Sequence, residues 1–165
     1  MDFAPSRLQI ALLFSGHDLT ENRAGRITYG QRQRILWSTA YYPIGAVLAL
    51  GLMALFEWKL LEAGIYAYYA QPMAFFFGIV VALALLGAWR PHVMDALFGP
   101  VDKIEGDLVR RSTMGIFRRI HYVRIGPRAF DLPKWAADEF SQEPWCCYYL
   151  PRTGRLLSAE KISQP

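Results

Sequence analysis

The chain has 165 residues, a net charge of +4 and an apolar fraction of 53%. This length suits one modest domain, or a membrane anchor with a very small domain, because an independent core usually needs on the order of 100 residues. The apolar residues gather in two segments and the basic residues gather in their flanks. This segregation argues against a soluble domain, and it favours anionic lipid headgroups over nucleic acid as the partner of the positive charge.

The N-terminal region, residues 1–34, is predicted to be a cytoplasmic helical segment. A short helix with leucines along one side is expected from Ser6 to Ser15, where it would lie on a membrane surface or dock onto a partner. Two pairs of residues have the spacing of a capping box and should begin the next helices: Asp18 with Glu21, and Thr28 with Gln31. The region lacks the pattern of a cleavable signal peptide, so the hydrophobic helices themselves would direct insertion.

Two transmembrane helices are predicted to form a membrane α-helical hairpin. No charged residue occurs between Ile35 and Phe56, and a helix that crosses about 30 Å of hydrocarbon needs roughly 20 residues. Residues 35–56 are therefore expected to be the first span. A second uncharged run extends from Ala63 to Trp89, and residues 72–90 are expected to be the second span, beginning at Pro72, a residue favoured in the first turn of a helix. Residues 57–71 would form a short extracytoplasmic loop between them.

The basic residues predict the orientation of this two-pass hairpin. Arginines precede the first span and follow the second, whereas Lys59 is the single basic residue of the loop. Because positive residues stay on the cytoplasmic side, both termini should be cytoplasmic. Arg32 and Arg34 would then lie at headgroup depth, where they are candidates for binding lipid.

Small residues recur at four-residue intervals in both spans, which permits close approach of helix backbones. They are Ala74, Gly78 and Ala82 in the second span, and Gly45 and Ala49 in the first. Two alternatives stay open: the hairpin packs against itself along these residues, or it packs against a helix of another subunit.

After the second span, residues 91–101 are predicted to be an interfacial linker. Pro91 should end the helix, because proline has no amide hydrogen and disfavours helical geometry in the preceding residue. A short amphipathic turn is expected from Val93 to Phe98, followed by the turn signal Gly99-Pro100.

Residues 102–165 are predicted to form a small cytoplasmic α+β domain of mostly antiparallel strands. A helix is expected from Pro133 to Phe140. The expected strands are Ile104 to Arg111, Ile116 to Ile125, Ala129 to Leu132, Trp145 to Leu150 and Arg155 to Ile162. Two arrangements fit this order and length: a strongly bent open sheet, or a small SH3-like or OB-like barrel.

The residue types present give no reason to expect an enzyme, a metal or a cofactor. Residues 35–56 and 72–89 contain no Asp, Glu, Lys, Arg or His, so a proton relay or transporter acting alone is not expected. The histidines have no short diagnostic spacing, and His92 is kept only as a candidate contact for a pigment or lipid. Cys146 and Cys147 are adjacent, and alternation along a strand should place one thiol in the core and the other on the surface.

The strongest candidate for binding is a basic strand face. Arginines alternate with aromatic residues in the second expected strand, and this face would bind acidic lipid or an acidic protein segment. Its members are Arg118, Arg119, Arg124 and Tyr122, next to Arg110 and Arg111. A basic strand face that simply contacts solvent is an equally open alternative.

These patterns predict a non-catalytic integral membrane protein that is an accessory or scaffold subunit of a larger membrane complex. Its partners would be membrane lipids and other membrane subunits, with no nucleic acid. An alternative is a stand-alone membrane-anchored adaptor that binds anionic lipid or an acidic protein through its basic face. A weaker alternative is a homo-oligomeric pore.

Overall fold

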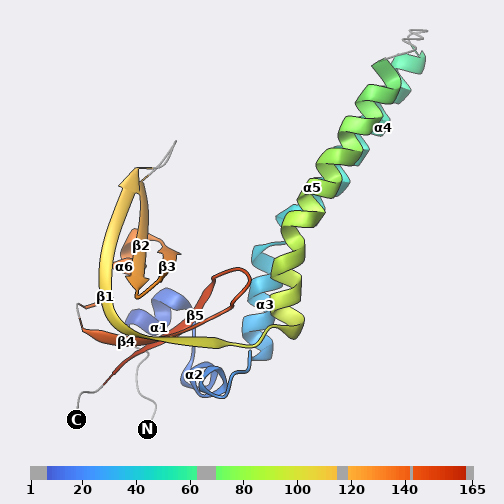
Figure 1. Cartoon of the computed structure of the whole chain (residues 1–165). Coiled ribbons are helices and arrows are strands. Elements are labelled where there is room, and N and C mark those ends of the chain that lie inside the picture. Colours follow the sequence, from blue (N-terminus) through green and yellow to red (C-terminus); the bar gives the residue numbers. More distant parts are fainter. Residues whose placement is uncertain (1–6, 63–69, 115–118, 142, 163–165) are drawn as a thin grey trace. The chain divides into compact units, whose positions relative to one another are not determined.

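The computed structural model describes residues 7–62, 70–114, 119–141 and 143–162 (Figure 1). The chain divides into two compact units. Arg34–Met94 form one, which we call the hairpin unit. Met1–Gln33 and Asp95–Pro165 together form the other, which we call the sheet unit.

Three helices build the long helical part of the chain: α3 (Tyr29–Ser38), α4 (Tyr41–Glu62) and α5 (Ala70–Phe98). Two stretches, Tyr29–Glu62 and Phe75–Phe98, are long and apolar enough to cross a membrane by length and composition. The predicted pair of long apolar helices is therefore confirmed. Its placement in a membrane stays a prediction.

The first of these stretches is interrupted between α3 and α4, at Thr39 and Ala40. Pro43 explains the interruption, because it cannot donate the helical hydrogen bond to Thr39 and its ring crowds that carbonyl group. Thr39 Oγ1 instead donates to the carbonyl oxygen of Ile35 at 2.9 Å.

The prediction that the second long helix ends near Pro91 was wrong, because α5 continues through this proline to Phe98. A contact with the far end of the sequence supports its last turn. Asp95 is fully buried, and its Oδ2 accepts hydrogen bonds from the Thr153 backbone N–H and hydroxyl, both at 2.8 Å. The expected linker is therefore much shorter than residues 91–101. Gly99 directly follows the helix, and a Cβ there would lie 2.6 Å from the Asp95 carbonyl oxygen.

Five antiparallel strands form one open sheet in the order β3-β2-β1-β4-β5. They are β1 (Asp102–Met114), β2 (Arg119–Ile125), β3 (Arg128–Leu132), β4 (Pro144–Tyr149) and β5 (Leu156–Lys161), with α6 (Lys134–Ala137) between β3 and β4. The predicted antiparallel α+β arrangement is confirmed. Among the described strands, β3 and β5 each have one neighbour, so closure into an SH3-like or OB-like barrel stays a prediction.

Strand β1 belongs to both halves of the sheet and curves along its length (Figure 1). Asp102 to Asp107 pair with β4, and Leu108 to Met114 pair with β2. Gly106 lies next to this change of partner with a φ of +151°, a backbone conformation that favours glycine.

Two N-terminal helices, α1 (Arg7–Leu12) and α2 (Gly16–Arg23), complete the sheet unit. Leu8 and Phe14 belong to the same hydrophobic core as Phe130, Phe140 and the core-facing residues of β4. Leu8 and Ala11 of α1 are therefore buried in the domain itself, whereas Ile10 is 56% exposed. The expected docking of this segment onto a membrane or partner stays a prediction. Helix α2 contacts β5, where Asn22 Nδ2 donates to Ser158 Oγ at 2.7 Å.

One of the two expected capping boxes is present as predicted. Gln31 N donates to Thr28 Oγ1 at 3.2 Å, and Thr28 N donates to Gln31 Oε1 at 3.3 Å. The other prediction was wrong, because Asp18 is the third residue of α2 and Ser15 is its N-cap. Ser15 N donates to Asp18 Oδ2 at 2.8 Å, so the box lies three residues earlier than expected.

Candidate binding surface

The small residues predicted for helix packing lie mostly between α4 and α5 of the hairpin unit. Gly78 is buried, and a Cβ at this position would lie 2.3 Å from Met53 Cγ. A Cβ on Gly45 would lie 3.3 Å from Leu85 Cδ1. Ala82 is buried. The side chain of Ala74 lies outside the described residues.

The small residues of α4 differ in burial. Ala49 is half-buried, whereas Ala46, which the spacing did not single out, is buried. Each glycine thus lies against a large side chain of the other helix, Gly78 against Met53 and Gly45 against Leu85. In this structure the small residues face the partner helix of the same hairpin.

The large apolar side chains of the hairpin unit are exposed. Only 6% of the most apolar window of the first stretch and 11% of that of the second is buried within the chain. Exposure of such a surface to water is unfavourable, because the free energy falls when apolar area is removed from water. The exposed side chains include Val47, Leu48, Leu52 and Leu55 in α4, and Phe76, Phe77, Leu83 and Leu86 in α5.

The candidate basic residues of the helical part lie in α3, where Arg32 and Arg34 are both half-buried. His92 lies in α5 with its ring stacked on Tyr42, the ring centroids being 5.8 Å apart. The described residues contain no group of three or more His, Cys, Asp and Glu side chains that could hold a metal ion.

The β1–β2 register separates the basic residues of the sheet unit between two faces. Leu108 pairs with Ile125, and Arg110 pairs with Val123, on the face that carries the core. On the opposite face, Arg111 pairs with Tyr122, and Val109 pairs with Arg124. The structure therefore brings the predicted residues Tyr122 and Arg124 together with Arg111.

Two predicted members of the basic face cannot be placed in the same way. Arg118 lies outside the described residues. Arg119 pairs with Met114 through its backbone, and its side chain lies outside what the structure describes.

The distal part of β1 and the part of β2 that pairs with it form what we call the arm: Val109–Met114 together with Arg119–Arg124. Its base joins the core through Val123, which is fully buried, and His121–Arg124 also pair with β3. Pairing between β1 and β4 ends at Asp107, so this part of β1 has β2 as its one paired neighbour. Every side chain from Val109 to Met114 is exposed. Met114 at the distal end is 79% exposed. The sequence analysis missed Val109 and Met114, because alternation alone does not tell where a core ends.

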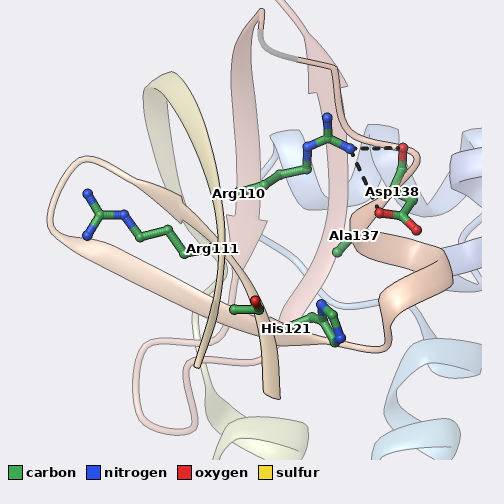
Figure 2. Close-up of a pocket in the computed structure, with 6 residues that line it drawn as sticks. Arg110, Arg111, His121, Ala137 and Asp138 are labelled. Carbon is green, nitrogen blue, oxygen red and sulfur yellow. Dashed lines mark hydrogen bonds and ion pairs between the residues drawn. The ribbon is translucent and has the colours of Figure 1, made fainter. Parts of the chain in front are cut away.

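An open cleft of about 380 Å³ lies against the core-side face of the arm (Figure 2). Arg110, Arg111, Ser112 and His121 line it from the arm, Ala137 lines it from α6, and Asp138 lines it just beyond that helix. Arg110 Nη1 lies 3.5 Å from the Asp138 carbonyl oxygen and 3.9 Å from its carboxylate. Figure 2 shows Arg111 directed away from Asp138, on the other side of the strand. Arg110 is thus already paired, whereas no carboxylate among the described residues pairs with Arg111.

The prediction that one cysteine is exposed was wrong, because both thiols are buried. Cys147 faces the core, and burial raises its pKa. Cys146 shares the opposite face with Tyr148 and Glu160, and burial raises its pKa as well. Tyr148 donates to Glu160 at 2.7 Å, and Arg23 of α2 pairs with the same carboxylate. This cluster covers the face that alternation assigns to solvent.

Comparison of the whole chain with protein-family models, with curated proteins and with solved structures found no match.

Proposed function

We propose that this protein is a non-catalytic accessory or scaffold subunit of a larger membrane complex. In this proposal α4 and α5 cross the membrane as a two-pass hairpin, and the sheet unit is held at the cytoplasmic surface. Other membrane subunits contact the outward faces of the hairpin.

The observation that carries the proposal is that both flanks of the hairpin build one domain. Asn22, which precedes the first long helix, is fully buried and donates to Ser158, which follows the second. Arg23 pairs with Glu160 across the same two regions. A bilayer cannot separate residues that share a core, so this supports an even number of crossings with both flanks on one side. The excess of arginine in the flanks favours the cytoplasmic side.

The exposed hairpin surface supports the role of a partner subunit. The small residues are used between α4 and α5, so the surface left for neighbours consists of large apolar side chains. Side chains seven residues apart lie on the same side of a helix. Phe76 and Leu83 form such an exposed pair in α5, and Leu48 and Leu55 form one in α4. Lipid tails and apolar helices both cover such faces, and packing against a specific helix depends on side-chain shape.

The test is extraction of the native protein into nanodiscs, followed by native-size separation and mass spectrometry. We expect other membrane subunits at a fixed ratio to this chain. The variants Phe76→Ala with Leu83→Ala, and Leu48→Ala with Leu55→Ala, provide matched double substitutions on the two helices. We expect one pair to abolish co-migration and the other to leave it unchanged, because a partner helix occupies one outward face and lipid the other.

Migration of the wild-type chain alone would overturn the proposal. Migration as a homo-oligomer would favour the pore, which conductance across reconstituted bilayers would then test. A complex that survives both double substitutions would show that the hairpin faces do not hold the partner.

A further inference from the structure

We infer that the arm binds the phosphate groups of anionic phospholipids at the surface of the membrane that holds the hairpin. The inference rests on the proposed membrane anchorage. It goes beyond the role of a subunit, because it assigns the arm a ligand that needs no protein partner.

The outward face of the arm carries two arginines suited to phosphate. Arg111 pairs with Tyr122, and Arg124 is the next residue on the same face of β2. Such diagonal neighbours are about 7–8 Å apart, so both guanidinium groups can reach one headgroup or two adjacent ones. Arg124 Nε donates to the Gly126 carbonyl oxygen at 3.0 Å, which leaves its terminal nitrogens for a ligand. Guanidinium groups bind phosphate oxygens in a bidentate manner.

The charge of the arm is of one sign. The strand residues Leu108 to Met114 and Arg119 to Ile125 include no aspartate or glutamate. Among the described residues, no carboxylate pairs with Arg111 or Arg124. The nearest ion pair on the arm joins Arg110 to Asp138 on the other face. Asp107 of β1 and Asp131 of β3 lie at the edges of this outward face, with Asp131 opposite Tyr122. Within the arm itself the outward face carries positive charge alone, and this part is complementary to an anionic surface.

The end of the arm favours lipid over an acidic protein segment. Met114, at the tip of the arm on the core-side face, is 79% exposed although its side chain is apolar, and Val109 is exposed on the outward face. At a membrane interface, apolar side chains enter the boundary of the acyl chains while arginines stay with the phosphates. An acidic peptide would neutralise the arginines but would give Met114 no apolar surroundings.

Connectivity limits how far the arm can lie from the end of α5. Helix α5 ends at Phe98, and β1 begins at Asp102. The chain from Phe98 to Met114 spans at most roughly 55 Å when fully extended. An anionic leaflet attracts basic residues within a Debye length of about 10 Å, and tethering raises the effective concentration of headgroups around the arm.

The test uses full-length protein in nanodiscs that contain no other protein. Met114→Cys carries an environment-sensitive fluorophore. Both native thiols are buried with raised pKa values, so they should react slowly, and labelled wild-type protein gives the background. Emission is compared in phosphatidylcholine alone and in phosphatidylcholine mixed with phosphatidylglycerol. The test variant adds Arg111→Glu and Arg124→Glu. The control variant adds Lys103→Glu and Lys134→Glu, which change the net charge equally at exposed positions outside the arm.

We expect a blue shift in the anionic nanodiscs that is absent in phosphatidylcholine, weakens at high salt, disappears in the arginine variant and persists in the lysine variant. The same emission in both lipids, or a shift that survives the arginine substitutions, would overturn the inference. A shift that appears only after a co-purified subunit is added would instead assign the arm to a protein partner. Failure of the protein to co-elute with nanodiscs at all would count against the membrane anchorage, which separates the two proposals.

Discussion

The two units of this protein differ in the side chains they bury. The sheet unit encloses large residues such as Phe130, Phe140 and Trp145 together with alanines such as Ala137. Between α4 and α5 the hairpin unit buries Gly78, Ala46 and Ala82, and many of its leucines and phenylalanines are exposed. The difference teaches that each unit suits a different solvent: water drives large apolar residues inward, whereas a lipid phase gives no such drive and rewards close backbone approach.

The largest effect is expected from Phe130→Ala, a substitution in the core of the sheet unit. Phe130 is fully buried, with its ring centroid 5.5 Å from that of Tyr149. The free energy of unfolding of the sheet unit should fall by about 3–5 kcal/mol. Hydrogen exchange of the strand amides in full-length protein in nanodiscs measures it. Leu83→Ala, at a position 63% exposed, is the control and should change the value by less than about 0.5 kcal/mol. Equal effects would remove the contrast between the units.

A smaller effect is expected from Ala82→Arg in the hairpin unit. Ala82 is buried between α4 and α5, and a charged residue at the centre of a span costs about 2.5–3.5 kcal/mol on the insertion scale. Glycosylation mapping should show a large loss of membrane integration. Ala82→Ser, similar in size and uncharged, should integrate nearly as the wild type does. Full integration of the arginine variant would argue that this helix is not embedded in lipid.

Gly78→Ala tests the close approach of the two helices. The added methyl group would lie 2.3 Å from Met53 Cγ, so the side chain of Met53 must move. Such overpacking typically costs about 1–3 kcal/mol. Steric-trap unfolding in bicelles measures the loss, and Met53→Ala in the same chain should recover most of it. Additive losses in the double variant would mean that these two residues do not contact one another.

The smallest effect concerns the ion pair between Arg23 and Glu160 on the outer face of the sheet unit. The hydrogen bond from Arg23 holds the pKa of Glu160 below its usual value of 4.5. A depressed carboxyl pKa contributes stability that is present above pH 4.5 and is lost as the pH falls through the lower folded-state value. Because the Arg23 side chain is 54% exposed, we expect less than about 1 kcal/mol.

Acid titration of the sheet unit by circular dichroism should therefore give a slightly flatter profile below pH 4.5 for Glu160→Gln than for the wild type. Glu143→Gln, on another exposed pair with Lys161, serves as the matched control. A Glu160→Gln profile identical to that of the wild type would show that the pair contributes nothing measurable.

The strands could be predicted because alternation and turn residues are features of the nearby sequence alone. Alternation and turn residues fixed β2 and β3, with Gly126 at a φ of +53° between them. The same alternation grouped Tyr122 with Arg124 on one face, as the register shows.

Contacts between distant parts of the sequence account for what the patterns missed. The helix passes Pro91 because Asp95 is held by Thr153, 58 positions away. Cys146 is buried because Arg23 and Glu160 gather over its face. The arginines of the arm were predicted but the exposure of Met114 was not, because this exposure depends on where the pairing of β1 with β4 stops, at Asp107. None of these contacts leaves a short-range signal.

The hydrogen bond between Asn22 and Ser158 joins residues 136 positions apart, so it cannot form until the ribosome has made both. At a ribosomal speed of about 5–20 residues per second, roughly 7–27 s pass between the appearance of the two side chains. Both long apolar helices emerge during that interval. Helices α1 and α2 are thus made before both long helices and find their partners only after them, and a chain stalled after α5 would present them uncovered to chaperones and proteases.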